Sequence, residues 1–531
     1  SRAQRGARVH FAGAAHASSA LVECDGDLIR SERLTGVTRI SRAELAPGIQ
    51  GDFVRALAGT RIVDLNDALA AMGIAMRNLG SAAFQSIAGA IATGTHGSGA
   101  SLGALADLAR SVDLVDGAGR RVRVEPAVGF TRTHRIPLGV RLLADDRAFR
   151  SVVVGVGVTG LVTSMVLDVR PAFVLSETRT LHTWEELASS DVDDAIRGAH
   201  HYEIWLNPYS REDGAHTALV TVRTEVDAST PRRPRVDPWP LRYRAIRTAI
   251  TVALDAFPRF VPAALDWAIA KQATDAPWVD ASSRIFDLGS INRMPALATE
   301  WFFPMARWKD AVHALLAEAR RLSLRPRAVG GVPFGVRFVR ASPHYLAPSF
   351  GAPGEIFCTV ELPVYDNEHD RSTLLAGYER AAERHGGRPH WGQAHRARPL
   401  ALGARYPKLD AWRQVRAAID PRERFANFTS YAEGLTPSRV PRPVIDDAPA
   451  FFDPSVPREV LALDRSAPFH VDRRRFHVDA SAKAFVGAFQ SALLQLGAMV
   501  AHRFEVLRLR ERAGELFALG ERFQGRFALD K

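Results

Sequence analysis

Cysteine, lysine and long apolar runs are scarce in this sequence, and each scarcity excludes a class of protein. The 531 residues include only Cys24 and Cys358, too few for a disulfide framework or a cysteine-rich zinc or iron–sulfur site. We therefore expect no metal centre of that kind. The best apolar run, Ala249–Ala256, is far shorter than the roughly 18 residues of a membrane-spanning helix. The N-terminal residues lack the apolar core of a signal peptide. We expect a bacterial-type cytoplasmic protein and leave association with a membrane surface open.

Arginine supplies almost all of the positive charge. The sequence has a net charge of +11 but only five lysines. A basic chain can bind nucleic acid. Here the basic residues are scattered and are not interleaved with aromatics, as strand-binding surfaces require. The densest cluster, Arg232–Arg235, lies in a proline-rich stretch, Ser229–Trp239, that is typical of a solvated loop. We expect no nucleic-acid partner.

The texture of the sequence changes twice along the chain. Residues 1–170 alternate short strands, helices and glycine turns, whereas residues 171–436 alternate aromatic-rich strands with amphipathic helices. Pro437–Pro443 is a linker signal. Beyond it, residues 444–531 are predicted to form a helical extension, mainly over Ala480–Leu519. The sequence therefore predicts an α+β protein of two domains and an extension.

Several elements can be placed from local patterns. Ser111–Asp116 and Arg121–Glu125 alternate apolar and polar residues around a glycine turn, which predicts a hairpin. Leu65–Met72 has helical spacing, with Asp64 as its expected cap. Ala148–Gly155 resembles a segment that enters a buried strand. Further predicted strands are Arg8–Ala12, Asp27–Arg30, Gly160–Val169, Arg337–Val339 and Ile356–Val364, and further predicted helices are Trp308–Leu322 and Arg371–His385.

Three segments of small residues carry the chemical signal. The longest, Asn78–Gly99, is nearly uncharged and rich in Gly, Ala, Ser and Thr. Small side chains let backbone N–H groups approach an anion such as a pyrophosphate. The alternative is a packing helix with a glycine turn. Gly13–Ser19 and Gly155–Gly160 have a similar composition. The last precedes a strand rather than a helix, which disfavours a Rossmann dinucleotide site.

Taken in order, these three motifs resemble the FAD-binding domain of the vanillyl-alcohol oxidase family, the PCMH-type flavoproteins. The segments EWFFP (residues 300–304), RPHWGQ (388–393) and DPRERFAN (420–427) resemble the branch of sugar-1,4-lactone and alditol oxidases. The resemblance spans roughly residues 8–435. It implies a PCMH-type FAD domain, part of which would precede residue 1, and a substrate (cap) domain with an antiparallel sheet flanked by helices.

The resemblance also implies which residues contact FAD. His16 stands where the family links flavin covalently through an imidazole. Ala17 replaces a serine expected to bond phosphate. Gly80 stands where a small residue gives O₂ access to the flavin. The full implied cofactor set is Gly13, Ala14, Ala15, His16, Ser18, Gly80, Ser81, Ser86, Gly89, Thr93, Gly94, Thr95, His96, Gly160 and Val162.

The implied substrate site departs from the family pattern. Arg337 is retained, but Gly335 and Gln393 stand where the family has glutamate and lysine. Loss of these charges predicts a less polar or differently placed substrate. Glu361, on a neighbouring predicted strand, is a candidate replacement for the carboxylate. Ser81 would orient the substrate hydroxyl. The candidates for a general base are His390, Glu361 and Tyr406.

The implied reaction is hydride transfer from the carbinol C–H of an alcohol, polyol or sugar lactone to flavin N5, with O₂ reoxidising the flavin to give H₂O₂. Two alternatives stay open. One is a flavin dehydrogenase that uses another electron acceptor. The other is a degenerate flavoprotein that serves as a binding or assembly module. In each case the C-terminal helices are expected to pack on the catalytic body, to pair with a second copy or a protein partner, or to contact a membrane surface.

Overall fold

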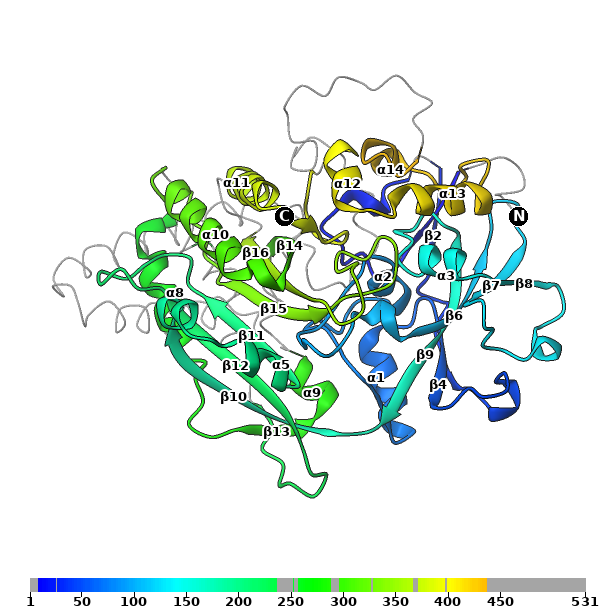
Figure 1. Cartoon of the computed structure of the whole chain (residues 1–531), viewed down its shortest axis with the longest axis horizontal. Coiled ribbons are helices and arrows are strands. Elements are labelled where there is room, and N and C mark those ends of the chain that lie inside the picture. Colours follow the sequence, from blue (N-terminus) through cyan, green and yellow to red (C-terminus); the bar gives the residue numbers. More distant parts are fainter. Residues whose placement is uncertain are drawn as a thin grey trace, which may run out of the picture.

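The computed structural model describes residues 8–24, 26–235, 252, 256–287, 296–325, 328–365, 371–396 and 399–436. Two β-sheets lie side by side, and helices pack against each of them (Figure 1). This confirms the predicted α+β class. The predicted linker Pro437–Pro443 and the helical extension lie outside the described residues. Among the described residues, no helix has the length and apolar character needed to cross a membrane.

The first sheet has seven strands in the order β3-β4-β9-β6-β7-β8, with β5 also pairing with β9. The long central strand β9 buries Met165, Leu167 and Val169, and these side chains join a core with residues of three helices, α1, α2 and α3. The strands are β3 (Val37–Arg39), β4 (Asp52–Leu57), β5 (Ile74–Met76), β6 (Ala109–Val115), β7 (Arg121–Glu125), β8 (Val140–Ala144) and β9 (Leu161–Pro171); the helices are α1 (Ile62–Ala71), α2 (Ile87–Ala92) and α3 (Asp146–Val152).

A separate two-stranded parallel sheet flanks the first predicted cofactor loop, with one strand before it and one after it. Its strands are β1 (Val9–Ala12) and β2 (Asp27–Arg30). The Val9 N–H donates to the Arg424 carbonyl over 2.7 Å. The Asn427 amide donates to the carbonyls of Leu21 and Glu23. Residues near the end of the described chain therefore fasten the strand from which Gly13 emerges.

The second sheet has eight strands in the order β13-β10-β12-β11-β15-β16-β14-β17, all antiparallel. Its apolar face, including Trp301, Val336 and Val360, packs on α10 and α11. Because successive side chains of a strand point to opposite faces of the sheet, the residues adjacent to these three lie on the face away from α10 and α11. The strands are β10 (Val174–Thr183), β11 (His201–Leu206), β12 (Thr217–Val226), β13 (Trp278–Ala281), β14 (Ala296–Pro304), β15 (Phe334–Arg340), β16 (Ile356–Tyr365) and β17 (Arg388–Pro389).

The helices of the second half do not all belong to the second sheet. Leu402, Leu409 and Trp412 of the closing helices lie in the core of the first sheet, and the Trp412 indole donates to the Ser151 carbonyl over 2.9 Å. The sequence division had grouped these residues with the second domain. The helices are α4 (Trp184–Ser189), α5 (Asp193–Gly198), α8 (Val261–Ala270), α9 (Ser282–Phe286), α10 (Trp308–Ser323), α11 (Arg371–Arg384), α12 (Pro399–Arg405), α13 (Leu409–Ile419) and α14 (Phe428–Ala432).

Two local predictions are wrong. The segment from Ala148 begins in a helix, α3, rather than a strand, because the Asp145 carboxylate accepts from the Ala148 N–H and so caps the helix. Asp64 is not a cap either: the N-cap of α1 is Arg61, and Asp64 lies in the first turn. The hairpin of β6 and β7 is confirmed.

Candidate active site

The three small-residue loops meet at one place in the structure. A Cβ atom at Gly13 would lie 2.2 Å from Ser86 Oγ, so any larger residue would displace the Ser86 side chain where the first loop meets the start of α2. The Val156 N–H donates to the Ala92 carbonyl over 3.1 Å, which joins the third loop to the end of the same helix. A pocket beside the first loop is lined by Gly13, Ala14, Ala15, Arg30, Ser31, Glu32, Gly59 and Arg61.

Two of these loops hold strained backbone. Among the described non-glycine residues, positive φ angles occur at Ala15 (53°), Val156 (45°) and Glu423 (54°). A left-handed conformation costs an L-residue roughly 1–2 kcal/mol. Strain of this kind persists where the surrounding structure fixes the backbone, often at functional sites. A left-handed residue beside a right-handed one is also the backbone pattern by which successive N–H groups can form an anion-binding concavity.

His16 lies on the first loop, next to the segment that carries Gln393. The Ser18 N–H donates to the Gly392 carbonyl over 2.8 Å, and the Ser19 hydroxyl donates to the Trp391 carbonyl over 2.7 Å. Burial lowers the pKa of His16 to about 4. Its ring is therefore neutral at neutral pH, the state in which an imidazole nitrogen is a nucleophile.

The end of α2 places several of the predicted cofactor residues. Ser86 and Gly89 are in contact, because a Cβ at Gly89 would lie 2.9 Å from Ser86 Oγ. The Thr93 hydroxyl donates to the Gly89 carbonyl over 3.1 Å. Gly94 has a φ of 81°. The buried Thr95 hydroxyl has no hydrogen-bond partner among the described residues, which leaves it available to a bound group.

The other predicted cofactor residues lie on either side of this helix. A Cβ at Gly80 would lie 3.1 Å from the His96 carbonyl oxygen, so Gly80 and the adjacent Ser81 lie beside the backbone of His96. Gly160 has a φ of 128°, and Val162 pairs with Leu114 in the ladder between β6 and β9. The structure thus brings Gly80 and Ser81 beside His96, and places Gly160 and Val162 on the first sheet.

Arg337 lies on β15 among three carboxylates from three other strands. Its Nε is 3.0 Å from Glu203, and its Nη1 is 2.8 Å from Glu361 and 3.7 Å from Glu300. Burial alone would lower the pKa of Arg337, but Glu361, Glu203 and Glu300 raise it. The guanidinium is therefore a fixed positive charge.

Glu361 occupies the place that the sequence suggested for a replacement carboxylate. In the register between β15 and β16, Glu361 lies directly opposite Gly335. The Gln393 amide donates to Glu361 over 3.4 Å. Glu361 has 25% of its side chain exposed, whereas Glu203 and Glu300 have 4% and 5%. Of the three carboxylates around Arg337, Glu361 is the one a substrate can reach.

The two other candidate bases differ in their surroundings. His390 Nδ1 accepts from the Gly392 N–H over 3.0 Å, and burial lowers the pKa of His390 to about 4, so its ring is neutral. The Tyr406 hydroxyl is buried and donates to the Pro389 carbonyl over 3.0 Å. Burial also raises the pKa of Tyr406. Tyr406 is therefore unsuited to act as a base, in contrast to the sequence-based suggestion.

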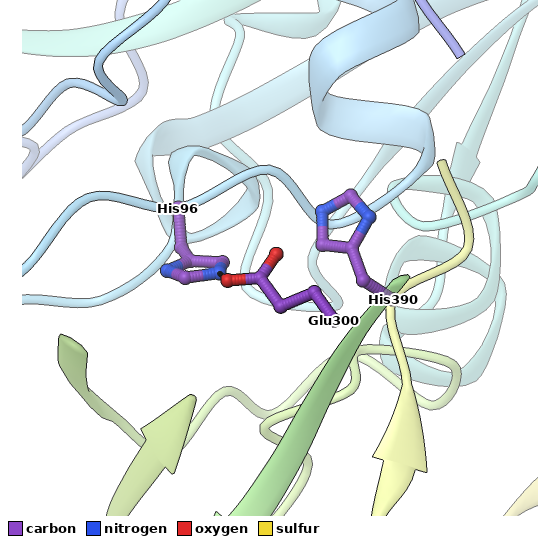
Figure 2. A group of neighbouring side chains, drawn as sticks. All are labelled: His96, Glu300 and His390. Carbon is purple, nitrogen blue, oxygen red and sulfur yellow. Dashed lines mark ion pairs between the residues drawn. The ribbon is translucent and has the colours of Figure 1, made fainter. Parts of the chain in front are cut away.

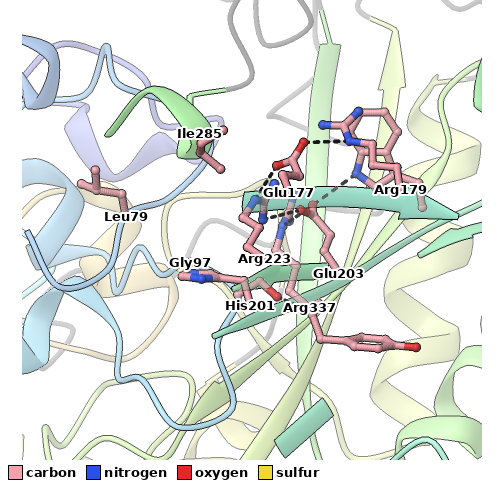
Figure 3. Close-up of polar contacts among 12 residues, drawn as sticks. Leu79, Gly97, Glu177, Arg179, His201, Glu203, Arg223, Ile285 and Arg337 are labelled. Atoms are coloured by element: carbon pink, nitrogen blue, oxygen red, sulfur yellow. Dashed lines mark hydrogen bonds and ion pairs between the residues drawn. The ribbon is translucent and has the colours of Figure 1, made fainter. Parts of the chain in front are cut away.

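The charges around Arg337 continue across the sheet (Figure 3). Arg223 lies between two carboxylates, 3.3 Å from Glu203 and 2.6 Å from Glu177. Arg179 lies 3.0 Å from Glu177. Burial alone would raise the pKa of Glu203, but Arg337 and Arg223 outweigh it and lower the pKa to about 2. Alternating charges on four strands therefore hold Arg337 in place.

A second cluster lies where the loop after α2 reaches β14 (Figure 2). His96 Nε2 is 3.2 Å from Glu300 Oε1, and the potential ligand atoms of His96, Glu300 and His390 lie within 4.8 Å of one another. The His96 ring also packs edge-on against Phe302, with ring centroids 4.9 Å apart. The side chain of His96, a predicted cofactor residue, therefore contacts β14.

Comparison with known proteins now bears on this arrangement. A family model described as D-arabinono-1,4-lactone oxidase matches residues 165–435, which are 271 of the 531 residues. The chain belongs to the D-arabinono-1,4-lactone oxidase family. A model of an FAD binding domain matches residues 2–125. The family resemblance predicted from the sequence is confirmed.

Similar proteins of known name agree with this assignment. An alditol oxidase of a Streptomyces strain is 28% identical over 405 residues, covering 76% of this chain and 84% of that protein. The L-gulonolactone oxidase of Scyliorhinus torazame is 24% identical (80% and 89%), and an L-gulono-1,4-lactone dehydrogenase of Mycobacterium tuberculosis is 25% identical (80% and 90%). The crystal structure of cholesterol oxidase from B. sterolicum shares the fold, with a TM-score of 0.65, 14% identity and coverage of 81% and 90%.

The loops of this lactone oxidase family member fit FAD. Gly13 brings its backbone close to Ser86, Ala15 is held in a left-handed conformation, and the Thr95 hydroxyl is buried without a partner among the described residues. These are the features of a backbone cradle for a pyrophosphate. We conclude that this member of the family binds FAD.

Sequence reasoning missed several residues of the charged sheet face. Glu203, Arg223 and Glu177 received no role, and Glu300 was used only as part of the EWFFP motif. The available signal was a charge inside an otherwise apolar strand, which is rarely buried without a partner. The partners could not be named because they depend on the strand register.

Proposed function

We propose that this D-arabinono-1,4-lactone oxidase family member uses FAD to oxidise a CH–OH group of a small alcohol, polyol or sugar lactone. The observation that carries the proposal is that Glu361, a partly exposed carboxylate, lies 2.8 Å from the fixed positive charge of Arg337. These residues lie on the sheet to which the FAD-binding loop is docked, since the Gly99 N–H donates to the Phe338 carbonyl over 2.6 Å.

Each residue of the site has a separate role in the proposed reaction. When bound, FAD accepts the carbinol hydrogen with its electron pair. The hydroxyl proton of the substrate passes to a Glu361 oxygen, and the C–O bond becomes a carbonyl. Arg337 stabilises the negative charge that develops on the substrate oxygen as this proton leaves. Ser81 and Gln393 orient the hydroxyl groups, and His390 lines the site as a neutral ring.

O₂ is the proposed final electron acceptor, with H₂O₂ as its product. Gly80 supports this proposal because it has no side chain beside the loop at His96. Gly80→Ala is expected to slow reoxidation by O₂ more than reduction by substrate. Equal effects on both half-reactions would favour a dehydrogenase that uses another acceptor, the activity named for the Mycobacterium relative.

A covalent bond between FAD and His16 is a further part of the proposal. The neutral His16 ring, on a loop fixed by Ser18 and Ser19, supports it. Denaturing electrophoresis should show a flavin-fluorescent protein band that His16→Ala abolishes. Flavin that is released by acid from the wild-type protein would instead mean that the cofactor is held without a covalent bond.

Peroxide formation tests the oxidase activity. Purified protein should release H₂O₂ with one or more sugar lactones or alditols. Leu138→Ala, which alters a fully exposed side chain, should match the wild type, whereas Glu361→Gln should fall well below it. Protein that contains flavin but gives no peroxide and reduces an artificial acceptor would replace the oxidase with the dehydrogenase. Protein without flavin would refute the proposed function.

A further inference from the structure

The hydrogen bonds of His96 fix where its protons lie. His96 Nδ1 is 2.8 Å from the Gly97 carbonyl oxygen. A carbonyl only accepts, so Nδ1 carries a proton. The opposite nitrogen, Nε2, is 3.2 Å from Glu300 Oε1. A neutral ring protonated on Nδ1 would therefore leave an unprotonated nitrogen beside a buried carboxylate oxygen that has no hydrogen-bond partner among the described residues. A second proton on the ring would turn this contact into an ion pair.

The charged groups around Glu300 favour its ionised form. Burial alone would raise the pKa of Glu300, but His96, His390 and Arg337 lower it. Arg337 Nη1 is 3.7 Å from the same oxygen that faces His96, and Glu203 and Glu361 contact Arg337 from its other sides. These contacts therefore favour an ionised Glu300 carboxylate beside His96.

A divalent metal ion is the other cation that could relieve this contact. His390 argues against it. Because His390 Nδ1 accepts from the Gly392 N–H, its neutral ring carries the proton on Nε2 and offers no second lone pair to a metal. The Arg337 guanidinium, 3.7 Å from Glu300 Oε1, would also repel a divalent ion. The geometry thus favours a proton.

The pair lies where the cofactor loop is docked on the second sheet. The Ser98 hydroxyl donates to the Tyr202 carbonyl on β11, and the Gly99 N–H bonds β15. A Cβ at Gly97 would lie 2.3 Å from the Leu79 carbonyl oxygen, directly before Gly80 and Ser81. The pair therefore lies close to the residues that are expected to face the flavin.

We propose that His96 and Glu300 hold one proton between them as a closed ion pair, which sets the charge balance around Arg337 and, through it, the ease with which FAD gains electrons. His96 is a positioning residue in this account. Without its charge, Glu300 would draw on Arg337 alone, and the site would gain one uncompensated negative charge. Only the effect on FAD rests on the proposed function.

Three variants and a control separate charge from packing. His96→Gln removes the positive charge, Glu300→Gln removes the negative charge, and the double variant restores a neutral polar pair. His344→Gln is the control, because His344 is a buried histidine whose pKa burial lowers to about 3 and whose Nε2 bonds the Ala106 carbonyl in the turn before β6. It should cost stability without altering the flavin.

Nitrogen-15 NMR of histidine-labelled protein tests the proton directly, with or without FAD. We expect a histidine signal with both ring nitrogens protonated at neutral pH that is missing in His96→Gln, which assigns it to His96, and that becomes neutral in Glu300→Gln. A His96 ring with an unprotonated nitrogen would overturn the proposal. So would a stoichiometric divalent metal, measured by elemental analysis, that both single variants lose.

The midpoint potential of the bound flavin tests the consequence. His96→Gln should shift it to a more negative value and slow flavin reduction by about tenfold, which corresponds to about 1.4 kcal/mol. Glu300→Gln should not shift it in that direction, and the double variant should return toward the wild type. Equal shifts in all variants would show a packing role and overturn the proposal. Failure of every substrate, with the NMR result intact, would refute only the proposed function.

Discussion

At the scale of single residues, Arg337 is the point on which the charges of the second sheet converge. Glu203, Glu300 and Glu361 reach it from β11, β14 and β16. A guanidinium held on several sides is preorganised, so it can stabilise developing charge without reorganising during the reaction.

Arg337→Lys is expected to lower kcat by about 10²-fold, because one ammonium group cannot reproduce the several directed N–H groups of the guanidinium. Steady-state kinetics with the best lactone or alditol would measure this. Arg340→Lys, an exposed position on the same strand, serves as the control. Equal activity of both variants would remove Arg337 from the mechanism.

Glu361→Gln should lower kcat by about 10²-fold through loss of the proton acceptor. Gly335 lies opposite Glu361, and a Cβ at Gly335 would lie 3.5 Å from the Arg337 guanidinium. The carboxylate can therefore be moved from position 361 to position 335. Adding Gly335→Glu to Glu361→Gln should recover at least about tenfold in kcat. If Glu361→Gln kept full activity, another residue would have to be the base.

The sequence identified individual residues of the site more successfully than the partners that these residues contact. Arg337 and Glu361 were named from the family resemblance and from a neighbouring strand. Glu203 and Glu300 were not, because their contacts depend on which strands become neighbours. Strand order across the second sheet brings β11 beside β15, although 127 residues separate the end of β11 at Leu206 from the start of β15 at Phe334.

At the scale of elements, the first cofactor loop holds its strain at a single alanine. Ala15 has a φ of 53°, and Ala17 is not among the described residues with positive φ. Glycine adopts the left-handed conformation without a Cβ penalty but costs entropy elsewhere.

Ala15→Gly should therefore raise the free energy of unfolding by about 0.5–1 kcal/mol, and Ala17→Gly should lower it by a similar amount. Thermal or denaturant unfolding of the FAD-free proteins would measure both. A loss of stability in Ala15→Gly equal to that in Ala17→Gly would show that the backbone at Ala15 is not strained.

Element boundaries follow from the sequence where local signals dominate. The glycine turn fixed the hairpin of β6 and β7, and the apolar spacing fixed α10 to within one residue. The segment after Asp145 was misread because Val152–Val154 are β-branched and favour strands. The cap that Asp145 provides and the core contacts of Phe149 prevail in the fold.

At the scale of the whole molecule, the closing helices end at a buried acidic residue. Glu433, directly after α14, is buried with one oxygen 3.7 Å from His395 Nε2. Burial raises the pKa of Glu433 to about 8 and lowers the pKa of His395 to about 4, so both groups are neutral at neutral pH.

Glu433 should therefore make the protein less stable as pH rises. In the unfolded chain its pKa is about 4.3, so between about pH 4 and pH 8 the folded state binds more protons, and stability falls across that window. Glu433→Gln mimics the protonated form. Its advantage over the wild type in unfolding free energy should grow by more than about 1 kcal/mol from pH 5 to pH 8. A pH-independent difference would contradict this assignment.

The division of the chain could be predicted only in part. The change in texture near residue 170 agrees with the passage from β9 of the first sheet to β10 of the second. The return of the chain to the core of the first sheet, at Leu402, Leu409 and Trp412, could not be predicted. An apolar helix face does not specify which of two cores it joins.

The central claim is that this chain binds FAD and reduces it with a hydroxyl-bearing substrate. The most direct measurement is the visible absorbance of the protein-bound flavin under anaerobic conditions, before and after addition of sugar lactones and alditols. Our account predicts that at least one of them bleaches the flavin and that Arg337→Lys slows this bleaching. Protein with bound flavin that none of these compounds reduces, or protein without flavin, would contradict the account.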